Sequence, residues 1–197
     1  MRTDAGTTLA EILVVVAILA AAAIVAVPAG ADLLSSARAE AGAREMATTF
    51  SALRFKSVAL RRYRGLLFER RGRDWVYFEV EDGNGNGLRT AEVRSGVDRT
   101  VSGPHRLEDD VEKATPGVPP GGPFPEVPPG SARVDETSDP VQFGSSDLVS
   151  FSPAGSASSG TLYVTDRRNG LAAVVLYGPT ARVRVWRFDP WRRRWSL

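Results

Sequence analysis

The chain has 197 residues, of which 43% are hydrophobic and 24% are charged, a composition typical of a globular protein and not of a disordered one. It contains no cysteine, so disulfides, thiolate metal sites and a thiol nucleophile are excluded. The formal net charge is only +2, and nearly all the positive charge is arginine, because Lys56 and Lys113 are the only lysines. A chain of this length predicts one globular domain with one non-globular element.

The first element is apolar. Twenty residues without a charge run from Ile12 to Ala31, and as a helix they are long enough to cross a hydrocarbon layer of roughly 30 Å. Glu11 stands at the head of this run, although a carboxylate in a membrane costs about 2.5 to 3.5 kcal/mol. An ordinary signal peptide, which is removed, needs no such acid. An ordinary signal peptide and a plain single-pass anchor remain alternatives.

The stretch Gly6, Thr7, Thr8, Leu9, Ala10, Glu11 resembles the processing signal of type IV pilins and type II secretion pseudopilins. That signal is a short leader that contains a basic residue and ends in glycine, and glutamate is the fifth residue of the processed chain. Pro28 lies twenty-one positions after Thr7, where the family commonly has a helix-kinking proline.

The resemblance implies that residues 1–6 are a leader, which a prepilin peptidase removes by cutting between Gly6 and Thr7, with methylation of the new amine. Residues 7–31 would then remain as the transmembrane half of a long helix. Glu11 would pair with the N-terminal ammonium of a neighbouring subunit, so that two charges that are costly in lipid become tolerable together. Glu11 and Pro28 are therefore the predicted assembly residues.

The helix is predicted to continue through an amphipathic half, residues 32–64, and to end near Arg62. Apolar residues recur there at helical spacing, which predicts a stripe that packs on a globular domain; they are Leu33, Leu34, Met46, Phe50, Leu53 and Leu60. Gly42 within this half costs about 1 kcal/mol relative to alanine.

Residues 65–197 are predicted to form a β-rich head. Two strands joined by a turn at residues 70–74 are followed by a glycine and asparagine loop and a further strand. Residues 101–142 are rich in proline and glycine, which predicts a loop or extended insertion. Four strand-like runs in the last third predict an antiparallel meander. The predicted fold class is α+β, with a long N-terminal helix packed on an antiparallel sheet domain.

The last third also resembles the GspH and FimT family of minor pseudopilins and minor pilins. The resemblance rests on Phe151, Ser152 and Pro153, on the strands at 160–163 and 171–177, and on Arg182, Val183 and Arg184. It implies the same pilin-like architecture and a structural role.

No constellation typical of an enzyme is present in the sequence. His105 is the only histidine, so a multi-histidine metal site is excluded, and its neighbourhood predicts a solvated loop. Asp109 and Asp110 lie in a charged run, and Ser152 lacks the flanking glycines of a nucleophile elbow. We expect neither catalysis nor a cofactor.

A weak candidate for a calcium site lies at Asp82, Asn84 and Asn86, which with Gly87 match the first half of a calcium loop. The acid required at the twelfth position is replaced by Val93, and Glu92 comes one residue early. A hairpin loop, for which asparagine and glycine are equally suited, is the alternative.

The C-terminus is basic, with six arginines against one acid in residues 181–197. Strand alternation places Arg182, Arg184 and Trp186 on one face and Val183 and Val185 on the other. The arginines fit a solvated edge strand, contact with lipid headgroups, or contact with DNA phosphates with Trp191 or Trp195 stacking on bases. The FimT resemblance associates this strand and tail with DNA uptake, so the candidate DNA contacts are Arg182, Arg184, Arg192, Arg193 and Arg194.

These observations predict a minor pseudopilin or pilin subunit of a type II secretion or type IV pilus machine, anchored in the bacterial inner membrane with a periplasmic head. The expected partners are other pilin subunits, the prepilin peptidase and the inner-membrane assembly platform. A DNA-binding minor pilin is the alternative. The sequence does not separate secretion from DNA uptake, because both use the same subunit architecture.

Overall fold

The computed structural model describes residues 9–197, apart from the side chains of residues 25–29. One helix, α1 (Leu9–Leu60), is followed by short helices and strands. The chain divides into two compact units, Met1–Leu34 and Ser35–Leu197. The predicted α+β class, with an N-terminal helix packed on antiparallel sheets, is confirmed.

Within the second unit, α1 packs on the head through a row of buried residues three or four positions apart. Met46, Phe50 and Leu53, all predicted to lie in this row, are almost fully buried, as are Ala39 and Ala43. The spacing places them on one side of the helix, which is how an amphipathic helix covers a core.

The expectation that Leu33, Leu34 and Leu60 continue the row is wrong, because more than half of each side chain is exposed. Near the start of the second unit, the hydroxyl of Ser35 accepts hydrogen bonds from the backbone N–H groups of residues 169 and 170. Near the end of the helix, Ser57 donates to the carbonyl of Ser152. The helix itself ends at Leu60, two residues earlier than predicted.

The first sheet has four antiparallel strands in the order β3-β2-β1-β8. Its members are β1 (Arg64–Arg71), β2 (Asp74–Glu81), β3 (Arg99–His105) and β8 (Leu148–Phe151). The predicted hairpin of the first two strands is confirmed, with Arg71 paired to Asp74 across the turn.

The second sheet runs in the order β12-β11-β10-β9-β4, with β7 also paired to β9. Its members are β4 (Thr115–Pro116), β7 (Val141–Gln142), β9 (Gly160–Thr165), β10 (Leu171–Tyr177), β11 (Arg182–Asp189) and β12 (Arg194–Ser196). The predicted meander is confirmed for β9, β10 and β11. Its first predicted strand, β8, instead pairs with β1 in the other sheet.

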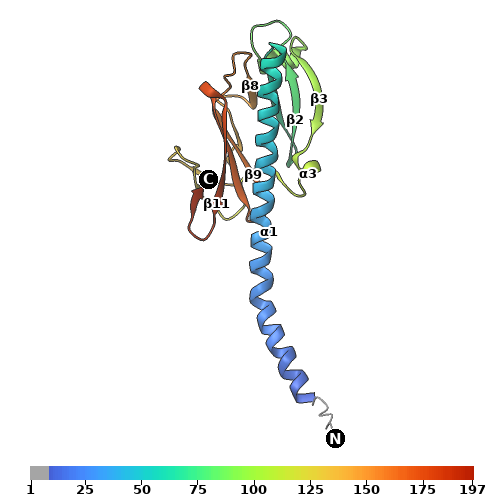
Figure 1. The fold of residues 1–197 in the computed structure, drawn as a ribbon, viewed down its shortest axis with the longest axis vertical. Helices are drawn as coiled ribbons and strands as arrows, with labels where there is room; N and C mark the ends of the chain where they lie inside the picture. Colours follow the sequence, from blue (N-terminus) through green and yellow to red (C-terminus); the bar gives the residue numbers. More distant parts are fainter. Residues whose placement is uncertain (1–8) are drawn as a thin grey trace. The chain divides into compact units, whose positions relative to one another are not determined.

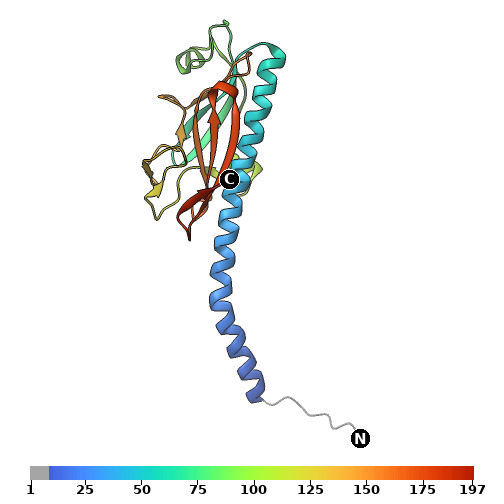
Figure 2. The same ribbon diagram turned by 60° about the vertical axis from the view of Figure 1, so that its left-hand side comes forward.

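The second half of α1 lies across both sheets, with β2 and β3 on one side and β9 and β11 on the other (Figures 1 and 2). The main core accordingly mixes helix residues with residues of each sheet: Phe50 shares it with Phe68 and Tyr77 of the first sheet and with Leu162 and Val174 of the second. One helix thus joins the two sheets into a single head.

The proline-rich insertion is packed against the head. It contains α3 (Leu107–Asp110) and the hairpin of β5 (Phe124–Pro125) and β6 (Arg133–Val134). Phe124, Val127 and Val134 are buried in a second core with Tyr163 and Phe188. The expectation of a loop over residues 101–142 is therefore only partly right. The strand β3 extends into the first residues of this range. The apolar side chains of the insertion cover the outer face of the second sheet.

The main core predicts the effect of a matched pair of substitutions on α1. Phe50→Ala removes a fully buried ring that contacts Phe143 and Phe151, so the free energy of unfolding should fall by about 4 kcal/mol. Phe55→Ala, at a position 75% exposed on the same helix, should change it by less than about 0.5 kcal/mol. Denaturant unfolding of the full chain in detergent measures both, and equal losses would contradict the packing described.

Candidate functional site

The N-terminal candidate site lies partly outside the described residues. Gly6 and Thr7, and the side chain of Pro28, are not described. Glu11 lies in the first turn of α1, and its side chain is exposed. An acid in this turn also interacts favourably with the positive end of the helix dipole.

The helix that follows Glu11 exposes apolar side chains on every side. Ile12, Leu13, Val14, Val15 and Val16 are consecutive, so they cover the full circumference of the helix, and each is more than half exposed within the chain. A helix that is apolar on every side is found in a protein core, among other helices or in a lipid bilayer. A search of the described residues finds no helical stretch with the length and hydropathy of a membrane span.

The loop after β2 is closed by its own hydrogen bonds. The carboxylate of Asp82 accepts from the backbone N–H groups of Asn84, Gly85 and Gly87. Asn84 and Asn86 donate through their side-chain amides to Glu92, at 3.1 and 3.0 Å. Burial opposes the charged form of Asp82, but these backbone donors outweigh it and lower its pKa.

The loop lies in the connection between β2 and β3, which pair as antiparallel neighbours. A short helix, α2 (Thr90–Ser95), is inserted in the connection, where the sequence predicted a strand directly after the loop. Asp98, which sequence analysis missed, also closes the loop. Its carboxylate accepts hydrogen bonds from the backbone N–H groups of Gly83 and Arg89. Among the described residues, no three histidine or acidic side chains gather as metal ligands.

The predicted DNA-contact arginines lie in two groups at opposite ends of β11. Arg182 and Arg184 are exposed in its first half, whereas Arg192, Arg193 and Arg194 lie in the turn after its last residue and at the start of β12. Asp189 comes five residue steps after Arg184 along the strand, a distance of roughly 16 Å. The structure does not bring all five arginines together.

The two groups also differ in how their side chains are held. Arg193 donates to the carbonyl of Pro123 at 2.8 Å, and Arg192 lies 4.0 Å from the carboxylate of Asp189. Trp195 donates to the carbonyl of Pro125 and packs on Tyr163 and Phe188, so its predicted availability for stacking is wrong. Trp191 is 83% exposed.

The first half of β11 follows the predicted alternation. Val183 and Val185 pack on the main core beneath α1, and Trp186 packs on the second core. Arg182 and Arg184 have no acidic partner within the described part of the chain. Tyr177, paired with Arg182 in the strand register and 57% exposed, adds an aromatic side chain that sequence analysis missed.

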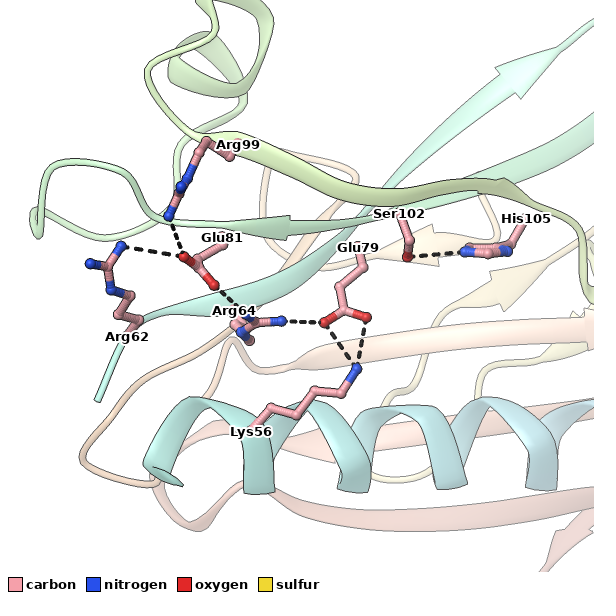
Figure 3. A network of polar contacts seen from close by, with 8 residues as sticks. All are labelled: Lys56, Arg62, Arg64, Glu79, Glu81, Arg99, Ser102 and His105. Carbon is pink, nitrogen blue, oxygen red and sulfur yellow. Dashed lines mark hydrogen bonds and ion pairs between the residues drawn. The ribbon is translucent and has the colours of Figure 1, made fainter. Parts of the chain in front are cut away.

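A network of charged side chains joins the end of α1 to the first sheet (Figure 3). Glu79 accepts from Lys56 at 2.9 Å and from Arg64 at 2.6 Å. Glu81 accepts from Arg62, Arg64 and Arg99. Burial opposes the charged form of Glu79, but Lys56 and Arg64 outweigh it and lower its pKa. Lys56 links α1 to β2, and the other pairs hold β1, β2 and β3 together, so we assign the network a structural role.

His105 lies beside the network. It is exposed, and its Nε2 lies 3.1 Å from the hydroxyl of Ser102 (Figure 3). Its ring also packs on Tyr77. The predicted solvated loop is wrong in one respect, because His105 is the last residue of β3.

Compared with models of protein families, with curated proteins and with solved structures, the chain matches none.

The network predicts a specific dependence of stability on pH. Because the pKa of Glu79 is lower in the folded chain than in the unfolded one, its carboxylate stabilises the fold at neutral pH, and this contribution is lost as the pH falls below about 4.5. Glu79→Gln should lower the free energy of unfolding by about 2 kcal/mol at neutral pH, and the difference from the unchanged chain should shrink at a pH of about 3.

Glu69→Gln is the matched control for denaturant unfolding across this pH range. Glu69 is also on the first sheet, but it lies 3.7 Å from Arg71 with 40% of its side chain exposed, so its replacement should change stability by less than about 0.5 kcal/mol. A Glu79→Gln deficit that is constant with pH would contradict the assigned role of the carboxylate.

Proposed function

We propose that this chain is a minor pseudopilin or minor pilin, a structural subunit of a type II secretion or type IV pilus machine that assembles through its N-terminal helix. The observation that carries the proposal is the stretch Gly6–Glu11 at the head of a helix whose apolar side chains are exposed on every side. A leader that ends in Gly6 and is removed by a prepilin peptidase would leave this helix as the new N-terminus.

The first half of the helix serves as the membrane anchor in this proposal. The charge-free run Ile12–Ala31 has the length of a bilayer-spanning helix, and lipid would cover its exposed apolar side chains before assembly. In a filament the same side chains pack on the helices of neighbouring subunits. The head would lie on the periplasmic side of the inner membrane.

Glu11 sets the position of the subunit in this scheme. Once the leader is removed, only two charges precede the apolar run. They are the carboxylate of Glu11 and the new ammonium at Thr7. An ammonium supplied by the neighbouring subunit, or its methylated form, compensates the carboxylate where lipid excludes water. Partner choice then depends on the head, because the apolar contact itself is non-directional.

The proposal predicts the mass of the mature chain. In cells that contain the prepilin peptidase, the protein should begin at a methylated Thr7, and in cells without the peptidase it should keep residues 1–6. Intact-mass measurement of the purified protein distinguishes the two. A mature chain that begins at any residue other than Thr7 would overturn the processing step.

Substitution of Glu11 separates assembly from processing. Glu11→Ala should be cleaved normally but fail to enter sheared filaments, whereas Glu11→Asp, which keeps the charge, should enter them at a reduced level. Filament content relative to membrane content is the measurement. Equal incorporation of Glu11→Ala and the unchanged chain would remove the role of the carboxylate.

A second candidate function is DNA binding during uptake, which is favoured by the exposed pair Arg182 and Arg184 beside Tyr177. Arginine side chains without acidic partners are free to contact phosphates, and an exposed tyrosine ring can stack on a base. In this function the head would bind DNA along the outer face of β10 and β11.

DNA binding predicts a salt-dependent loss on charge reversal. Arg182→Glu with Arg184→Glu should abolish retention of a single-stranded oligonucleotide by the full chain in detergent, and binding by the unchanged chain should weaken steeply with salt. The control is Arg192→Glu with Arg194→Glu, at the other end of β11. Retention that survives reversal of Arg182 and Arg184 would exclude this site.

A further inference from the structure

Strand β11 has an open edge over the first part of its length. Its residues 182–187 pair with β10, but β12 pairs only with residues 187–189 on the opposite side. In the described chain no other segment pairs with residues 182–186 on that side. The backbone N–H and C=O groups that point outward there are available to a further strand.

A groove runs beside this open edge, between β11 and the last turns of α1. It has a volume of about 750 Å³ and is lined by Ser51, Arg54, Phe55 and Val58 of the helix and by Thr180, Ala181, Arg182 and Val183 of the sheet. Phe55 and Val58 are 75% and 47% exposed and provide its apolar wall.

The edge and the groove fit one extended chain together. A strand added to β11 would lie about 4.8 Å from it, and its alternate side chains would point to opposite faces. Those on the helix side would contact Phe55 and Val58, next to Val183. Those on the other side would lie beside Arg182 and Arg184.

The charges around the groove select the side chains of such a strand. Arg54 and Arg182 line the groove, and Arg184 is exposed further along β11. The described chain supplies none of the three with an acidic partner. Positive charge on an edge strand discourages pairing with a second copy of itself, because the arginines of the two copies would meet. The same charge favours a strand that carries carboxylates.

A nucleic-acid strand fits this edge less well. Phosphate oxygens only accept hydrogen bonds, whereas an open strand edge offers both N–H donors and C=O acceptors. The carbonyls would stay unsatisfied and would repel the phosphates. An extended peptide satisfies both kinds of group.

We infer that the open edge of β11, with the groove along α1, is a strand-addition site for an extended segment of a partner protein in which acidic residues alternate with apolar ones. This goes beyond the proposed assembly through the N-terminal helix, and it needs no contact made by residues 9–34. Main-chain hydrogen bonds provide the affinity for the added strand. The arginines and the apolar wall of the groove determine which peptide sequences bind.

The test uses the full chain in detergent and a short fluorescent peptide in which glutamate and valine alternate. Fluorescence anisotropy should show saturable binding. Binding should be about tenfold weaker when lysine replaces glutamate in the peptide, or when the protein carries Arg182→Glu with Arg184→Glu. Arg192→Glu with Arg194→Glu is the control and should bind like the unchanged chain.

Backbone methylation of the peptide separates strand addition from simple charge attraction. Only every second amide of an added strand faces β11, so N-methylation of one alternate set should abolish binding, while methylation of the other set should leave it within about twofold. Folding of each protein variant is checked by its unfolding curve. This measurement does not depend on processing at Thr7, so it can fail while the proposed function stands.

Three results would overturn the inference. They are the absence of binding by the glutamate–valine peptide, equal effects of the two methylated sets, and binding of a single-stranded oligonucleotide at Arg182 and Arg184 without binding of the peptide. The last result would assign these arginines to DNA.

Discussion

The close approach of α1 to the second sheet depends on Gly42. A Cβ atom at this position would lie 2.6 Å from the Cβ of Ala114, closer than real contacts allow, and 3.0 Å from Val164 Cγ1, which is tighter than most real contacts. The sequence shows only a cost of about 1 kcal/mol for glycine in a helix. The structure shows what that cost permits: with no side chain at this point, the helix lies deep enough for Phe50 and Met46 to reach the cores of both sheets at once.

This packing determines which surfaces of the second sheet remain open. Its inner face is covered by α1, so the outer face needs another cover, and the proline-rich insertion provides it through Phe124, Val127 and Val134. Trp195 and Arg193 attach the C-terminal end to the same insertion. This cover does not reach the first half of β11. The edge of the strand, its arginines and the neighbouring groove therefore stay exposed there.

Periodic patterns in the sequence predicted the elements whose packing is local. The row of Met46, Phe50 and Leu53, the first hairpin, and the strands β9 to β11 follow directly from side-chain spacing. Pairing between distant segments could not be predicted this way: β8 joins β1 across more than seventy residues, and only tertiary contacts decide that choice. The candidate sites show the same division. Alternation placed Arg182 and Arg184 correctly. The packing of Trp195 against the insertion, the part of Asp98 in closing the loop and the exposure of Tyr177 instead depend on which segment covers which face.

The chain presents two surfaces of different chemistry, and they place different demands on a partner. The apolar side chains from Ile12 onward gain from any cover that excludes water, whether lipid or helix, so this segment discriminates poorly between neighbours. A strand edge discriminates well, because its donors and acceptors must be matched in register and its arginines penalise a basic partner. In the proposed function, a subunit that is present in few copies needs a specific neighbour more than it needs a strongly bound one. If contacts of the N-terminal helix provide most of the free energy of assembly, the open edge of β11 is the part of the described head best suited to determine which partner binds.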